Sequence, residues 1–172
     1  MAIIEEEEEE LYTTNEQDQK AVSELQKRIS KANATNPSDA LEAQTSSDWK
    51  PAPSVSIDEG QWKYVLISAT EPFPTEDGSD ECYTAFFVTS KRGANYHQNA
   101  AEPYVDLLQS RGYQNIHVSG GGRINLNSEE KSVRIFGFSY GFGLADHSAS
   151  KRVIERDNRY RGYTITWSND GY

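Results

Sequence analysis

Two side chains in the sequence have types that could cleave or hold a charged group. His97 lies in a Tyr-His-Gln segment with no evident packing role. Histidine exchanges protons near neutral pH, so it could act as a general base or as a nucleophile. Lys63 lies in an apolar run, in register with residues that would face a core. A lysine there either marks the solvent end of a strand or faces a cleft and binds an anion.

Two glycine-rich segments could present backbone N–H groups to the same anion. Gly120-Gly121-Gly122-Arg123 is interpreted as a turn that ends on a cation. Ser139-Tyr140-Gly141-Phe142-Gly143 follows a strand-like run and precedes a helix start, for which Asp146, Ser148 and Ser150 are candidate N-caps. A strand, a glycine turn and a helix start can together direct several N–H groups at one phosphate. The alternative is that both segments are plain connecting loops.

Other catalytic and metal sites have weaker support. Gly137-Phe138-Ser139-Tyr140-Gly141 matches the G-x-S-x-G pattern of the α/β-hydrolases. Those enzymes need a longer parallel sheet and a histidine far downstream, whereas His147 follows Ser139 by only eight positions, so we reject the match. His117 falls inside an expected strand and is interpreted as structural. No group of histidine, cysteine and carboxylate residues has the spacing of metal ligands, and we expect neither a metal nor a cofactor.

Composition favours a cytoplasmic protein. The chain has 172 residues, enough for one domain with a substantial core, and a single cysteine, which fits a reducing compartment. Residues 1–60 hold 14 acidic and 5 basic side chains, and residues 61–172 hold 13 and 12. This distribution lacks the basic surface of nucleic-acid-binding proteins, and no apolar run is long enough to span a bilayer. We expect a monomer that binds neither nucleic acid nor membrane.

Residues 1–56 are predicted to be an acidic arm and linker, and residues 57–172 a folded domain. The six glutamates at 5–10 should stay solvated. A helix is predicted over residues 15–34 and should end at Asn36-Pro37-Ser38. Its apolar residues form one narrow stripe: Val22, Leu25, Ile29 and Ala32. A lone helix of this length is marginal in water, so it docks on its own domain, pairs with a partner protein or frays.

The domain itself is predicted to be α+β. Two helices are expected, over residues 96–111 and 151–156, and Pro103 suggests that the regular part of the first helix begins there. Six short strands are expected at 62–69, 81–89, 113–119, after the glycine turn at 120–122, at 133–138 and at 163–167. Strands and helices do not alternate regularly, which favours a single mixed sheet in an α+β domain.

Over residues 57–172 the sequence resembles the Janus/Ocnus family, whose known enzyme is the protein-histidine phosphatase. The matching segments occur in the order of the family: Lys63-Tyr64-Val65-Leu66-Ile67, Tyr96-His97, Gly120-Gly121-Gly122-Arg123-Ile124, Gly137-Phe138-Ser139-Tyr140-Gly141, Asp146-His147 and the terminal Thr166-Trp167-Ser168-Asn169-Asp170-Gly171-Tyr172. Each segment alone is a weak signal, and their order makes the resemblance specific. Residues 1–56 lie outside it.

The resemblance implies a metal-independent phosphatase that acts on phosphohistidine, and by extension phospholysine, in proteins. It implies that His97 is catalytic, as a general base or as a phosphoryl acceptor, and that Lys63 binds substrate. It further implies that Ser139, Tyr140 and Gly141 hold the phosphate mainly through backbone N–H groups, with Arg123 beside the same cleft. Phosphoryl transfer depends mostly on positioning and charge stabilisation, so such a set could suffice.

One departure from the family concerns Thr89, eight residues before His97, where family phosphatases can carry an arginine. Lys91 or Arg92 would have to reach the site instead. The alternative function is a non-catalytic Janus-type domain that binds a phosphorylated partner, or a structural subunit that associates through its N-terminal helix. The presence of both His97 and Lys63 favours the enzyme.

Overall fold

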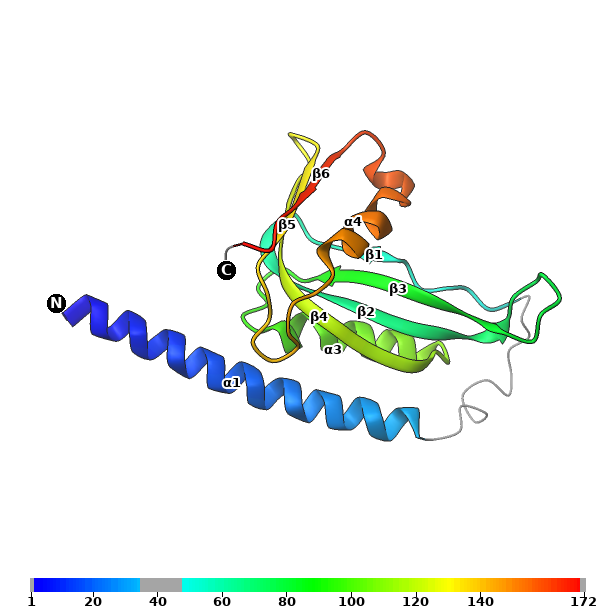
Figure 1. Ribbon diagram of the computed structural model, residues 1–172, viewed down its shortest axis with the longest axis horizontal. Coiled ribbons are helices and arrows are strands. Elements are labelled where there is room, and N and C mark those ends of the chain that lie inside the picture. Colours follow the sequence, from blue (N-terminus) through cyan, green and yellow to red (C-terminus); the bar gives the residue numbers. More distant parts are fainter. Residues whose placement is uncertain (1, 35–47, 171–172) are drawn as a thin grey trace.

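A computed structural model describes residues 2–34 and 48–170 of the chain. Six strands form one mixed sheet with helices on both faces (Figure 1). The α+β class and the sheet of six strands predicted from the sequence are therefore confirmed. The described residues contain three α-helices, two of them in the domain and one in the N-terminal arm. Gly171 and Tyr172, which end the terminal family motif, lie outside the described residues.

The sheet is built around its two longest strands, β2 and β4. In chain order the strands are β1 (Val55–Ser56), β2 (Gly60–Pro74), β3 (Cys82–Ser90), β4 (Gln114–Asn127), β5 (Ser132–Phe136) and β6 (Thr164–Trp167). They lie side by side in the order β1-β3-β2-β4-β5-β6. The central pairs are antiparallel, whereas β1 and β6 pair in parallel at the two edges.

β4 runs without a break through Gly120, Gly121 and Gly122, so the turn predicted there is wrong. Two expected strands are one, and the sixth strand is instead β1, within the expected linker. These glycines allow close approach of other segments. A Cβ atom at Gly120 would lie 2.6 Å from the backbone nitrogen of Ala145, and one at Gly122 would lie 2.5 Å from the carbonyl oxygen of Phe136.

Helices cover the two faces of the sheet and give it two hydrophobic cores. α1 (Ala2–Asn33) and α3 (His97–Ser110) lie on one face, whereas α4 (His147–Glu155) and the short 3₁₀ helix η1 (Asn158–Tyr160) lie on the other (Figure 1). Successive residues of β2 divide between the two cores, as the alternation of a strand requires: Val65 packs with α3, and Leu66 packs on the α4 side. No helix in the described ranges is long and apolar enough to cross a membrane.

α3 begins at His97, and the expectation that its regular part starts at Pro103 is wrong. The side chain of Asn99 accepts a hydrogen bond from the Tyr96 N–H at 3.0 Å and closes the first turn. Pro103 lies in the second turn, where its missing N–H removes only one helical hydrogen bond. The helix therefore starts early enough to place His97 at its first position.

α1 begins at Ala2, earlier than predicted, and docks on its own domain. Val22, Leu25 and Ile29 are at most 5% exposed and share the core of α3. The Arg28 guanidinium bonds carboxylates of α3, and the Asn33 amide bonds the backbone N–H and C=O of Ile116 at 3.2 and 3.1 Å. The sequence left open whether this helix docks on its own domain, pairs with a partner protein or frays, and in the structure it docks on its own domain. Its expected end at residues 36–38 lies outside the described residues.

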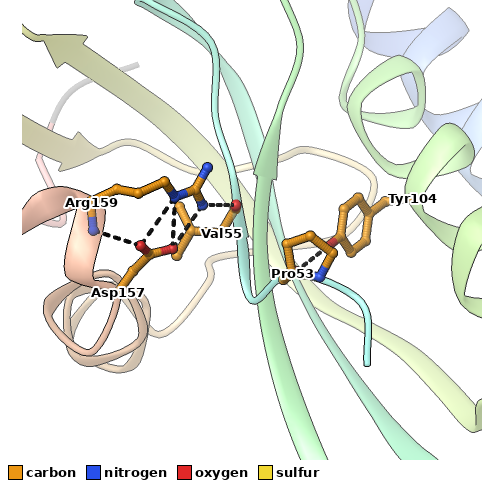
Figure 2. A network of polar contacts seen from close by, with 5 residues as sticks. All are labelled: Pro53, Val55, Tyr104, Asp157 and Arg159. Carbon is orange, nitrogen blue, oxygen red and sulfur yellow. Dashed lines mark hydrogen bonds and ion pairs between the residues drawn. The ribbon is translucent and has the colours of Figure 1, made fainter. Parts of the chain in front are cut away.

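Residues 49–57, expected to be part of a linker, pack against the domain from both faces of the sheet. Figure 2 shows the Tyr104 hydroxyl of α3 bonded to the Pro53 carbonyl. On the opposite side, the Arg159 guanidinium donates to the Val55 carbonyl at 2.6 Å and pairs with Asp157 (Figure 2). These partners are about 50 and 100 residues away in sequence, so the Pro- and Ser-rich composition of the segment did not predict its docking.

Candidate active site

His97 is fully buried where the first turn of α3 meets β4. Its Nε2 lies 2.9 Å from the Gly122 carbonyl oxygen, which can only accept a hydrogen bond. Nε2 therefore carries a proton, and Nδ1 is the basic nitrogen of the neutral ring. Gly121 makes room for this contact, since a Cβ atom there would lie 2.8 Å from His97 Cδ2 and 3.1 Å from Ser139 Cβ. His97 and Ser139 thus come together over a glycine.

Lys63 and Arg123 are cross-strand partners on β2 and β4. Arg123 follows Gly121 by two residues, so its side chain leaves β4 on the face that holds His97. Lys63 is buried, with its Nζ 5.7 Å from the centroid of the Tyr96 ring. It does not lie at a solvent-exposed strand end. The sheet register therefore brings both cations to the face of the catalytic histidine candidate.

Residues 139–143 form a tight loop closed by its own hydrogen bonds. The Ser139 N–H donates to the Gly143 carbonyl at 3.1 Å, and the Gly143 N–H donates back at 2.8 Å. The Ser139 hydroxyl oxygen accepts from the Phe142 N–H at 3.1 Å. The N–H of Gly141 takes part in none of these three bonds, and Tyr140 is exposed. The middle of the loop is therefore the part placed to meet an anion.

The start of α4 is capped by its own residue rather than left open toward this loop. Asp146 is the N-cap, and its carboxylate accepts from the Ser148 hydroxyl at 2.6 Å and from the Ala149 N–H at 3.0 Å. These two hydrogen bonds lower the pKa of Asp146 below its ordinary value. The Asp146 carboxylate therefore satisfies the N–H of Ala149 at the helix start itself.

His147 is buried on the opposite face of β4, in a network that fixes the base of the loop. Its Nε2–H donates to the Gly137 carbonyl at 2.7 Å, and its Nδ1 accepts from the Tyr64 hydroxyl at 2.5 Å. The same hydroxyl lies 3.1 Å from the Ser150 hydroxyl. Burial lowers the pKa of His147 and so favours the neutral ring, in which Nδ1 is the acceptor. It holds Gly137, where the chain leaves β5 for the loop.

We expect His147 to make the stability of the protein depend on pH. Burial lowers the pKa of His147 from its ordinary 6.5, against the opposing effects of the Gly137 carbonyl and Asp146. Below pH 6.5 the unfolded chain binds a proton that the folded chain excludes. The free energy of unfolding should therefore decrease as the pH is lowered, by at most about 1.4 kcal/mol per pH unit. Urea unfolding between pH 7.5 and about 5 should show a shallower fall in His147→Gln than in the parent or in His117→Gln, an exposed control. Equal slopes would contradict the assignment.

The ordered motifs and the site geometry agree with a comparison to known proteins. The sequence model of the Janus/Ocnus family (Ocnus) matches residues 49–164. The chain belongs to the Janus/Ocnus family. It is 35% identical over 128 residues to the 14 kDa phosphohistidine phosphatase of Sus scrofa, covering 73% of this chain and 96% of that protein. It is 32% identical over 121 residues to the protein of the same name from Homo sapiens, covering 70% and 93%.

A relative with a different name is also similar. The chain is 34% identical over 133 residues to the sex-regulated protein janus-A of Drosophila pseudoobscura pseudoobscura, covering 77% of this chain and 85% of that protein. The family match begins at residue 49, so α1 lies outside it. It includes the segment 49–57 that packs on both faces of the sheet.

The position where family phosphatases can carry an arginine lies inside this Janus/Ocnus domain. Thr89 is buried near the end of β3, opposite Val65. The Arg92 guanidinium lies 5.9 Å from the Trp62 ring, so the arginine is engaged there rather than at His97. Among the side chains that the structure describes, no three histidine, cysteine or carboxylate residues are grouped as metal ligands would be.

The N-terminal helix of this family member contacts the site at two points that the sequence did not predict. The Tyr96 hydroxyl donates to Gln17 Oε1 at 2.5 Å. A Cβ atom at Gly141 would lie 2.6 to 3.0 Å from the Val22 side chain, so that side chain lies directly on the loop. Only the apolar stripe signalled that Val22 would be covered, and nothing in the stripe identified Gly141 as part of the covering surface.

Proposed function

We propose that this Janus/Ocnus protein hydrolyses phosphohistidine in proteins without a metal ion, with phospholysine as a second substrate class. The observation that supports it most is the placement of His97, Lys63 and Arg123 on one face, beside the loop at 139–141. A phosphoryl group bonded to nitrogen is an anion, and cations with preorganised N–H groups stabilise its transfer. The names of the Sus scrofa and Homo sapiens relatives support the same substrate class.

Each residue has a role that follows from its place. Lys63 and Arg123 attract the equatorial oxygens, and the N–H groups of Tyr140 and Gly141 are assigned to donate to them. Ser139 acts through its backbone and shapes the loop, since its N–H and its hydroxyl oxygen are used within that loop. In this assignment Lys63, Arg123 and the loop bind the phosphoryl group, and His97 carries out the reaction.

Two routes through His97 Nδ1 remain open. As a general base, Nδ1 takes a proton from water while the water oxygen attacks phosphorus and the P–N bond breaks. The proton on Nδ1 then passes to the departing nitrogen, which restores the neutral His97 ring. As an acceptor, Nδ1 attacks phosphorus and displaces the substrate nitrogen, and water then hydrolyses the phosphorylated His97. Both routes use the hydrogen bond from Nε2 to Gly122 to orient the ring.

A second candidate function is a domain that binds a phosphorylated partner without turnover. The complete burial of His97 favours it, because a catalytic group must touch its substrate. Thr89 in place of an arginine favours it as well. The two functions differ in whether phosphate is released.

Incubating the full chain with a phosphohistidine peptide in excess EDTA tests the proposal. We expect release of inorganic phosphate at the same rate with and without the chelator, because the stabilising charges belong to the protein. A phospholysine peptide tests the second substrate class in parallel. Loss of activity in EDTA with recovery on adding a divalent cation would contradict metal independence. Tight peptide binding without phosphate release would support the binding domain.

We expect Lys63→Ala to raise KM more than it lowers kcat. A held anion is stabilised in the ground state and in the transition state alike, so the loss should appear mainly as roughly a tenfold higher KM. Steady-state kinetics with the phosphohistidine peptide would measure it, with the exposed Lys91→Ala as the matched control. A fall in kcat at constant KM would instead assign Lys63 to the transition state.

A further inference from the structure

His97, Ser139 and Lys63 are closed off from solvent, whereas Arg123 is half-buried and Tyr140 is exposed. His97 is 0% exposed, Ser139 1% and Lys63 6%. Attack on phosphorus requires the reacting atoms to approach to about 3 Å. A phosphorylated side chain of another protein cannot come that close to a ring with no exposed surface. Some element that covers the site must therefore move before the proposed substrate can enter.

α1 is the element placed to move. It lies beside α3 and the loop that follows β5 (Figure 1). Gln17 bonds the hydroxyl of Tyr96, the residue directly before His97, and Val22 rests on Gly141 in the loop. The helix lies outside the family match, which begins at residue 49. It is thus a cover added to a domain that the relatives share.

The contacts of α1 divide into two groups along its length. Leu25 and Ile29 are buried in the α3 core, Arg28 bonds Glu102 and Asp106, and Asn33 bonds the backbone of Ile116. The polar contacts of Arg28 and Asn33 go to α3 and β4, whereas Leu25 and Ile29 share their hydrophobic cluster with Phe142 of the loop at 139–143. The Gln17 and Val22 contacts lie N-terminal to the bonds of Arg28 and Asn33, so they can break while those bonds keep the later part of the helix docked.

We propose that α1 is a gate over the candidate active site, held closed by Val22 and Gln17, and that substrate reaches His97 only when this part of the helix lifts. The identity of what enters, a phosphorylated protein segment, rests on the proposed function. The gate rests on the burial of His97 and on the two contacts. Opening breaks the Gln17–Tyr96 hydrogen bond and exposes Val22 together with the part of the loop that it covers, so variants at Gln17 and Val22 should open the gate.

The three histidines of the chain allow a test that does not need activity. Diethyl pyrocarbonate modifies accessible imidazoles, and mass spectrometry of peptides gives a rate for each histidine. His117 is exposed and should react fast in every variant, whereas His147 is internal and should stay slow. We expect Val22→Ala to speed His97 modification about tenfold, the size typical of deleting buried methyl groups. Val153→Ala truncates a buried valine in the other core and should leave His97 unchanged.

An equal His97 rate in Val22→Ala and the parent overturns the gate. If Val22→Ala speeds His97 and His147 together, the protein is opening globally, and Gln17→Ala decides. That variant removes one hydrogen bond at an exposed residue, so faster modification of His97 alone supports the gate and no change overturns it. Hydrolysis of the phosphohistidine peptide should rise in parallel with His97 modification. No hydrolysis by any variant would refute the proposed function, while the modification rates still decide the gate.

Discussion

Phosphohistidine hydrolysis should fall by at least about 10³-fold in His97→Ala, because the basic nitrogen that takes the proton or the phosphoryl group is removed. The ratio of kcat/KM between parent and variant, measured with the same peptide, checks this. Activity within about threefold of the parent, a difference under 1 kcal/mol, would remove His97 from the mechanism.

The controls must separate chemistry from folding, since the structure corrects the expectation that His97 has no packing role. Its ring is fully buried and donates to the Gly122 carbonyl, so the alanine leaves a cavity as well as removing a base. His97→Gln fills part of that space and offers an amide donor without a basic nitrogen. It should be closer to the parent in melting temperature than His97→Ala, and equally inactive. His117→Gln, the same change at an exposed histidine, should keep full activity.

Gly121→Ala should both destabilise the protein and displace His97. The new Cβ atom would lie 2.8 Å from the Tyr64 carbonyl oxygen and 2.8 Å from His97 Cδ2. The backbone of a central strand cannot shift easily, so we expect the free energy of unfolding to fall by about 3 kcal/mol. We also expect His97 to be displaced, which should leave little hydrolytic activity. Urea unfolding and peptide hydrolysis measure the two effects.

Gly93→Ala is the matched control for this change. Nothing lies within 4 Å of a Cβ atom there, and the only penalty is the positive φ of +78°. It should cost about 1 kcal/mol and leave hydrolysis near the parent level. A Gly121→Ala protein as stable and active as the parent would mean that His97 and β4 are not in the close contact described.

Much of the candidate site could be anticipated because its signals are local. His97 next to an expected helix, Lys63 in a strand and the glycine loop before Asp146 occur in an order specific to one family. The strand and helix patterns report periodicity within short windows, which was sufficient for the α+β class. The apolar stripe of Val22, Leu25 and Ile29 likewise predicted that this face of the helix would be covered, either by its own domain or by a partner protein.

Tertiary structure alone decided how these pieces meet. A run of three glycines fits a turn or a close approach equally well, and only the packing of Ala145, Phe136 and His97 against β4 selects the second. The sequence offered several cap residues before α4, and only the structure shows that the Asp146 carboxylate bonds the N–H of Ala149 in its own helix. An apolar stripe indicates that one face of a helix must be buried, but it does not identify the surface that buries it. The hydrophobic effect is non-directional and favours any apolar surface equally. That Val22 rests on Gly141, and closes the site with it, depends on residues 119 positions apart.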